Sequence, residues 1–152
     1  MTIEELQDPK DAPFDLLELA DPSRRQIELY LKQGRCFVLK LENQIAGVLV
    51  LSELTPEKLE VKNVAISEVH QGKGYGKKML MLAKEVALDS GYQKLMIATG
   101  NSSIGQLALY QKMGFEMVEI VKDHFIKNYP EPIYENGIQC KHQVVLEMKL
   151  KI

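Results

Sequence analysis

The spacing of hydrophobic residues predicts helices first and strands afterwards in the first half of the chain. Apolar residues lie between acidic ones over residues 13–20, and Asp21-Pro22-Ser23 ends this helix and begins another that runs to about residue 31. The apolar segments that follow are separated by tight polar turns, and strands joined in this way run antiparallel. These strands are expected at residues 36–41, 45–54 and 60–66.

Helices and strands alternate in the second half. Apolar residues recur at intervals of three and four after residue 76, and Gly91 stands where a C-terminal glycine cap belongs. The strand at 94–99 should run parallel to the strand before this helix, because a crossover helix joins them. Ser103-Ile104-Gly105-Gln106 has the spacing of a capping box and opens a helix that stops at Gly114. Further strands are expected at 115–121 and 142–150.

These elements predict an α+β fold with a mixed, mostly antiparallel sheet of about six to seven strands and about four helices. The 152 residues suit one compact domain over 1–152 that is long enough to bury a substantial core. Hydrophobic residues make up 45% and charged residues 26%, which is the balance of a soluble globular protein.

Composition excludes several classes of function. A net charge of -2 argues against general nucleic-acid binding, which needs clustered Lys and Arg. No apolar segment approaches the length of a membrane span and the first residues are acidic, so we expect a cytoplasmic protein. Cys36 and Cys140 form no CxxC pair, and the three histidines form no HExxH motif, so we expect no metal. Cys36 lies in an apolar strand and is expected to be a buried hydrophobic residue.

A glycine-rich hexamer, Gln71-Gly72-Lys73-Gly74-Tyr75-Gly76, separates the strand at 60–66 from the next helix. A strand, a loop with exposed N–H groups and a helix N-terminus form an anion site in that order. The hexamer lacks the spacing of a P-loop, because Gly76-Lys77 is followed by Lys78 instead of Ser or Thr. It also lacks the dinucleotide fingerprint GxGxxG, which would need glycine at position 77.

The hexamer resembles the acyl-coenzyme-A signature of the GNAT superfamily of N-acetyltransferases, [Arg/Gln]-x-x-Gly-x-[Gly/Ala]. A second landmark of that family, an asparagine after the next strand and a helix ending in Tyr and then Gly-Phe, is similar to Asn101, Tyr110, Gly114 and Phe115. The resemblance is strong over about residues 35–121. It implies a three-layer α/β/α fold whose CoA site lies at a splay between two parallel strands. It also implies transfer of an acetyl group from acetyl-CoA to a primary amine, by direct attack in a ternary complex.

The resemblance also implies roles for individual residues. The strand before the loop would offer main-chain groups to pantetheine, the loop amides would hold the pyrophosphate, and Lys73 or Lys77 would add charge. Asn101 would bind the pantetheine arm, Tyr110 would lie near the thioester sulfur, and Ser103 would touch the cofactor. The cofactor-binding residues are therefore expected to be Val64, Ala65, Ile66, Gln71, Gly72, Lys73, Gly74, Tyr75, Gly76, Lys77, Asn101, Ser103 and Tyr110.

The catalytic residues implied in the same way are Glu60 and Tyr110. Glu60, directly or through water, would take a proton from the amine, and the Tyr110 phenol would hydrogen-bond or protonate the departing thiolate. Each has a structural alternative: Glu60 as a solvated carboxylate at a strand end, and Tyr110 as a helix tyrosine buried in the core. Asn101 could simply lead into its helix, and Ser103 could simply cap it.

The sequence says least about the amine that would accept the acetyl group. The segment 123–137 is long for a hairpin connection, and its aromatic and acidic side chains suit a cationic amine. Tyr129, Glu131 and Tyr134 are the expected acceptor residues, with the N-terminal helices forming another wall. A homodimer contact is the alternative use of this segment. The alternative function for the whole chain is a non-catalytic acyl-CoA sensor or interaction module on the same fold.

Overall fold

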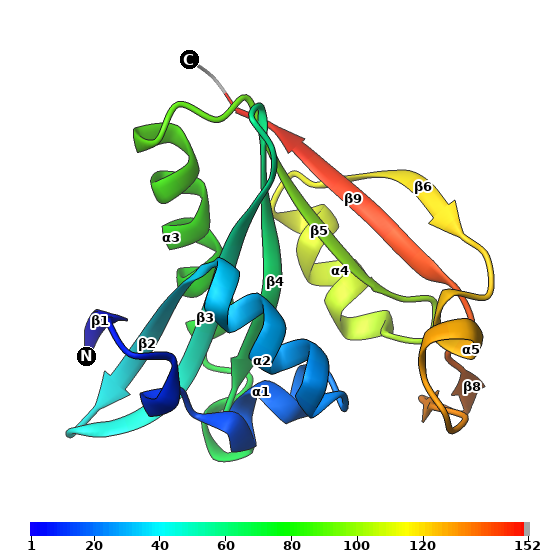
Figure 1. Cartoon of the computed structure of the whole chain (residues 1–152), viewed down its shortest axis with the longest axis horizontal. Coiled ribbons are helices and arrows are strands. Elements are labelled where there is room, and N and C mark those ends of the chain that lie inside the picture. The colour runs from blue at the N-terminus through cyan, green and yellow to red at the C-terminus, as the bar shows by residue number, and fades with distance from the viewer. Residues whose placement is uncertain (151–152) are drawn as a thin grey trace. The chain divides into compact units, whose positions relative to one another are not determined.

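The computed structural model of the protein describes residues 1–150, in two compact units, Met1–Leu95 with Leu150, and Met96–Lys149 (Figure 1). The elements in chain order are β1 (Thr2–Leu6), η1 (Pro9–Asp11), α1 (Phe14–Ala20), α2 (Arg24–Gln33), β2 (Arg35–Leu41), β3 (Gln44–Thr55), β4 (Lys58–Ile66), η2 (Glu68–His70), α3 (Tyr75–Asp89), β5 (Lys94–Gly100), α4 (Ile104–Lys112), β6 (Glu116–Val121), α5 (His124–Asn128), β7 (Tyr134–Glu135), β8 (Ile138–Gln139) and β9 (Gln143–Lys149). The main sheet has the strand order β1-β2-β3-β4-β5-β9-β6, and β7 pairs with β8 separately.

The first unit contains the predicted meander. β2, β3 and β4 pair antiparallel in sequence order, and β1 adds an antiparallel edge strand beside β2. The turn between β2 and β3 passes through Glu42 and Asn43, both at positive φ (50° and 66°), as a two-residue type I′ hairpin requires. The meander expected from the apolar pattern is therefore confirmed.

Helices cover both faces of this sheet. Successive strand residues point to opposite faces, so Val48 and Val50 face one side and Leu49 and Leu51 the other. Val48 and Val50 belong to a buried cluster with residues of α1 and α2, whereas α3 contacts β3 and β4 (Figure 1). Since Leu49 and Leu51 are also at most 1% exposed, α3 covers the second face.

Local sequence explains where the helices of this unit begin and end. Ser23 caps α2 by accepting a hydrogen bond from the Gln26 N–H at 3.2 Å. Gly91 lies just beyond α3 at φ 82°, as the glycine-cap prediction requires. The two helices predicted before residue 34 are thus both present.

The second unit departs from expectation in the segment 123–137. Instead of an irregular loop it contains α5 and the first strand of the β7-β8 hairpin. The hairpin turn is Asn136-Gly137, at φ 55° and 73°, which matches the type I′ turn favoured by this pair. α5 has five residues, too few to show a helical period in the sequence, and it starts after Asp123 at φ 60°.

The capping box predicted at the start of α4 does not form through Ser103. Ser103 is the N-cap residue of α4, but its side chain makes no cap hydrogen bond. Its hydroxyl instead donates to Glu135 Oε1 at 2.9 Å. This bond to a carboxylate orients the Ser103 side chain, and in that orientation the hydroxyl oxygen accepts no hydrogen bond from the first turn of α4.

Within residues 1–150, none of the helices has the length and apolar character needed to cross a membrane.

Candidate active site

The glycine hexamer forms the turn after η2 and the first two residues of α3, and two of its glycines have left-handed backbone. Gly72 lies at φ 76° and Gly74 at φ 86°, and a Cβ at either would meet no atom within 4 Å. The glycines therefore serve backbone conformation and not close packing. Gly74 is the N-cap of α3, with no side chain capping the helix.

The start of α3 presents donors outward. The Lys78 N–H makes the first bond of the helix, to the Gly74 carbonyl at 3.1 Å, so the N–H groups of Tyr75, Gly76 and Lys77 have no partner within the helix. These amides and the positive end of the helix dipole favour an anion. Lys73 and Lys77 are exposed on the same turn. The Gln71 N–H, by contrast, donates to the Glu68 carbonyl at 3.3 Å.

The side chain of the predicted residue Gln71, together with Ser67 and His70, which were not predicted, contacts the residues that flank this loop. Gln71 Nε2 donates to the Ile66 carbonyl at 2.9 Å, which ties the hexamer to the end of β4. His70 Nδ1 lies 2.7 Å from the Ser67 hydroxyl, and the His70 ring meets Tyr75 edge to face at 6.4 Å. The conformation of the loop is thereby fixed from both ends before any ligand binds.

The predicted pantetheine residues end β4, and Ser67 and η2 separate them from the hexamer. Val64, Ala65 and Ile66 pair with Leu49, Val48 and Gly47 of β3. Ala65 and Ile66 are buried and Val64 is half-buried.

Glu60, the predicted base, lies nearer the start of β4 and is not a freely solvated carboxylate. Its side chain is 12% exposed, and Glu60 Oε1 lies 3.1 Å from Lys62 Nζ. Lys62 was not among the predicted site residues. It occupies a β-bulge, because the β3 pairing passes from Val50↔Asn63 to Leu51↔Val61 and leaves Lys62 as the extra residue.

A second unpredicted group on β4 is Asn63, which is 4% exposed. Its Nδ2 donates to the Leu17 carbonyl at 3.0 Å and to the Tyr30 hydroxyl at 2.9 Å. The Leu17 carbonyl can only accept a hydrogen bond, so the side-chain atom of Asn63 that faces it must be the amide nitrogen. Tyr30 in turn donates to Asp21 Oδ2 at 3.3 Å. This chain of hydrogen bonds holds α1 and α2 to β4 at the residue next to Lys62.

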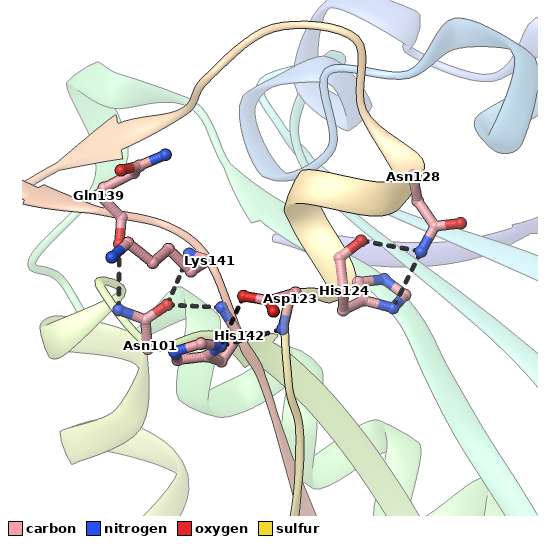
Figure 2. A network of polar contacts seen from close by, with 7 residues as sticks. All are labelled: Asn101, Asp123, His124, Asn128, Gln139, Lys141 and His142. Carbon is pink, nitrogen blue, oxygen red and sulfur yellow. Dashed lines mark hydrogen bonds and ion pairs between the residues drawn. The ribbon is translucent and has the colours of Figure 1, made fainter.

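The second unit holds the remaining predicted residues, and Asn101 is the centre of its polar network (Figure 2). Asn101 Oδ1 accepts from the backbone N–H groups of Lys141 and His142, each at 2.8 Å, and Nδ2 donates to the Gln139 carbonyl at 3.1 Å. His142 Nδ1 accepts from the Asp123 N–H at 3.0 Å. Asn101 and His142 thus close the base of the segment that runs from Asp123 to His142.

Next to Asn101, the hydroxyls of Ser102 and Ser103 both donate to Glu135 Oε1, at 3.3 and 2.9 Å. The residue before Asn101, Gly100, lies against Cys140, and a Cβ at Gly100 would collide with the Cys140 sulfur. Burial raises the pKa of the Cys140 thiol, and burial likewise raises the pKa of Cys36 to about 11. Both cysteines are free, buried thiols.

Tyr110 lies in α4, is 5% exposed and packs against Phe115 with ring centroids 6.0 Å apart. Burial raises the pKa of its phenol well above the usual range. The hydroxyl therefore stays protonated at any working pH and remains a hydrogen-bond donor.

The predicted acceptor residues lie beyond α5. The Tyr129 ring packs on Phe125 at 5.5 Å, Glu131 is exposed, and Tyr134 in β7 is 66% exposed. Glu131 and Tyr134 are thus the predicted acceptor residues that this segment exposes. Within residues 1–150 no group of three or more His, Cys, Asp or Glu side chains is arranged to hold a metal ion.

Asn101→Ala is expected to lower the free energy of unfolding by roughly 2 to 3 kcal/mol, because three side-chain hydrogen bonds are lost. Hydrogen exchange should speed up at the Lys141 and His142 amides. Asn128→Ala is the matched control: it removes two exposed contacts with His124, to the carbonyl at 2.8 Å and to Nδ1 at 3.4 Å, and should cost less than about 0.5 kcal/mol. Unchanged stability with a raised Michaelis constant for acetyl-CoA would instead support a purely cofactor-binding role for Asn101.

The strand, glycine loop and helix N-terminus are typical of proteins that bind an anionic ligand. Comparison with known proteins identifies the family. The family model "Acetyltransferase (GNAT) family" matches residues 2–115. The chain is 43% identical over 150 residues to the uncharacterised N-acetyltransferase YvbK of Bacillus subtilis, covering 99% of this chain and 97% of that protein.

Solved structures agree. An "IAA acetyltransferase" from Bacillus cereus superposes with a TM-score of 0.95 at 47% identity, over 98% of this chain and 99% of that one. A GNAT family acetyltransferase from Elizabethkingia anophelis with acetyl-CoA bound gives 0.95 at 45% identity, over 98% and 97%.

The chain belongs to the GNAT family of acetyltransferases and is an N-acetyltransferase. It has the mixed α+β fold of that family, in which a mostly antiparallel seven-stranded sheet contains one parallel pair, β4 and β5. The predicted family and fold class are confirmed.

Proposed function

We propose that the chain transfers the acetyl group of acetyl-CoA to a primary amine, by direct attack in a ternary complex. The observation that carries this proposal is the loop from Gln71 to Gly76, in which two glycines at positive φ lead into N–H groups of α3 that have no partner within the helix. A relative at 45% identity is solved with acetyl-CoA bound, which supports the same cosubstrate here.

In this proposal each part of the cofactor has its own set of residues. The amides of Gly72, Gly74, Tyr75 and Gly76 take the pyrophosphate with charge from Lys73 and Lys77, while Gln71 acts by bracing the loop. Main-chain groups of Val64, Ala65 and Ile66 take the pantetheine arm. Asn101 and Ser103 shape the pantetheine region, partly by holding the segment that follows them.

The chemistry falls to Glu60 and Tyr110. An alkylammonium with a pKa of about 10.4 must lose a proton before it can attack, and Glu60 is the proposed base, directly or through water. The half-buried position of Glu60 supports this role. Tyr110 would donate a hydrogen bond to the departing thiolate, and an amide near Ala65 or Ile66 would stabilise the oxyanion.

For the acceptor we propose that Tyr129, Glu131 and Tyr134 contact a cationic amine. The alternative for this segment is a contact between two copies of the chain. We also propose that the two units act as a single acetyltransferase domain and that the protein works in the cytoplasm.

An amine panel tests this function. The full chain with acetyl-CoA is offered polyamines, amino acids, aminoglycosides and peptides with free N-termini or lysines, with free-thiol release measured, alongside calorimetric titration of acetyl-CoA. The Tyr129→Ala, Tyr134→Ala double variant should raise the Michaelis constant of the best amine roughly fivefold and leave that of acetyl-CoA unchanged. The reverse pattern would contradict the acceptor role, acetyl-CoA binding without transfer to any amine would favour the sensor alternative, and no binding at millimolar acetyl-CoA would overturn the proposal.

A further inference from the structure

β4 itself carries a primary amine beside the proposed base. Lys62 Nζ lies 3.1 Å from Glu60 Oε1, and the two side chains are 34% and 12% exposed. An acceptor ammonium that gives its proton to Glu60 would need a position of this kind, within hydrogen-bond distance of the carboxylate. The ammonium of Lys62 meets this requirement toward Glu60.

The backbone around Lys62 fixes this placement. Lys62 is the extra residue of a β-bulge, a feature that redirects side chains and is common next to active sites. The following residue, Asn63, is held by the Leu17 carbonyl and the Tyr30 hydroxyl at 3.0 and 2.9 Å. The lysine thus starts from a rigid point on β4, although its four-carbon stem remains flexible.

The same strand leads to the proposed acetyl donor. Val64, the first of the residues proposed to bind pantetheine, lies two residues further along β4, about 7 Å away at the usual rise of a strand. A lysine side chain spans a comparable distance.

We propose that Lys62 is a self-acetylation site, modified by acetyl-CoA bound to the same chain. This inference rests on the proposed function, since it uses the same donor and the same base. Glu60 takes a proton from the Lys62 ammonium, and the neutral amine attacks the acetyl carbonyl. The new C–N bond forms as the C–S bond breaks, and the second proton that the nitrogen must lose passes to the departing coenzyme A thiolate, which leaves as the free thiol. The product amide is uncharged, so Glu60 loses its ion-pair partner.

The chain provides a matched control in Lys40. Lys40 Nζ lies 2.9 Å from Glu4 Oε2, and its side chain is 30% exposed, close to the 34% of Lys62. Both lysines lie on strands and pair with a glutamate. Lys40 is in β2, paired with an edge strand, away from the proposed pantetheine residues of β4. Spontaneous acetylation should modify Lys62 and Lys40 at similar rates, whereas the proposed reaction should modify Lys62 faster.

The experiment incubates the full chain with isotopically labelled acetyl-CoA and no added acceptor, and quantifies acetyl-lysine at both positions by peptide mass spectrometry. Lys62 should be acetylated at least tenfold faster than Lys40, at a first-order rate that does not change when the protein is diluted. Glu60→Gln should slow the reaction at Lys62 at least tenfold, and Glu4→Gln should leave it unchanged. Lys62→Arg keeps the ion pair and should remove this modification from a folded protein.

Equal rates at Lys62 and Lys40, or a rate at Lys62 that falls on dilution, would overturn the inference. The amine panel and the calorimetric titration separate this failure from that of the proposed function. If acetyl-CoA binds and an added amine is acetylated while Lys62 stays unmodified, self-acetylation is wrong and the function stands. If acetyl-CoA does not bind, both fail.

Discussion

Gly74→Ala is expected to weaken acetyl-CoA binding about tenfold, whereas Gly91→Ala should leave it unchanged. The two glycines flank the same helix, α3, at φ 86° and 82°, and a Cβ at either position would meet nothing within 4 Å. An alanine at either site therefore carries the same backbone strain, about 1 to 2 kcal/mol. Only at Gly74 does relief of that strain turn the amides of the next residues away from the proposed pyrophosphate position.

Calorimetric titration of acetyl-CoA and thermal unfolding, on both variants, check this expectation. Both proteins should lose similar stability, because the strain is the same at the two ends of the helix. The dissociation constant of acetyl-CoA should rise only for Gly74→Ala. The expected tenfold rise corresponds to a loss of about 1.4 kcal/mol in binding free energy. Equal dissociation constants for the two variants would show that the loop geometry at Gly74 does not matter for the cosubstrate.

Features encoded by neighbouring residues could be predicted from the sequence. The loop at Gln71 to Gly76 is one, because positive φ calls for glycine and a helix N-terminus follows at once. The meander is another, because short polar turns separate its apolar strands at Glu42-Asn43 and Pro56-Glu57. The order of helices and strands could be predicted from the spacing of apolar residues and from the turn residues between them. The family resemblance was strong over the segment in which these patterns are clearest.

Features that depend on distant partners could not be predicted. The bulge at Lys62 depends on how β4 registers with β3, and Asn63 depends on Leu17 and Tyr30, which are 46 and 33 residues away. The family motif drew attention to Asn101, but nothing local indicates that its side chain binds backbone groups 38 to 41 residues later. Polar residues whose role is set by tertiary contacts show no period and no neighbouring turn signal.

The contacts in the structure change the interpretation of two predicted site residues, Glu60 and Asn101. Glu60 was expected either as a base or as a solvated carboxylate, and the structure shows a carboxylate that is half-buried and paired with Lys62. Asn101 was expected either to bind the cofactor or to lead into a helix, and in the structure its side chain hydrogen-bonds the backbone of a later segment at Lys141. In both cases the side chain has a structural partner, so activity measurements need stability measurements beside them.

Tyr110→Phe is expected to lower kcat roughly 10- to 100-fold with little change in the Michaelis constant of acetyl-CoA. A hydrogen bond to a charged group contributes about 1.5 to 3 kcal/mol, and the thiolate carries its full charge only as the C–S bond breaks. Because burial raises the pKa of Tyr110, its phenol is a poor proton donor to a thiolate of pKa near 8.5 but a constant hydrogen-bond donor. The pH dependence of kcat should therefore contain no limb due to Tyr110 below about pH 10.

Two further measurements separate this role from a structural one. The variant keeps the ring that packs on Phe115, so its thermal unfolding near pH 7 should change little. The folded protein holds Tyr110 protonated while an unfolded tyrosine ionises near pH 10, so the wild type should lose stability above that pH and the variant less so. Tyr92→Phe is the matched control, since it removes an exposed hydroxyl bonded to Glu53 at 2.8 Å and should leave kcat unchanged. If Tyr110→Phe also left kcat unchanged, the phenol would be part of the core of α4 and not of the chemistry.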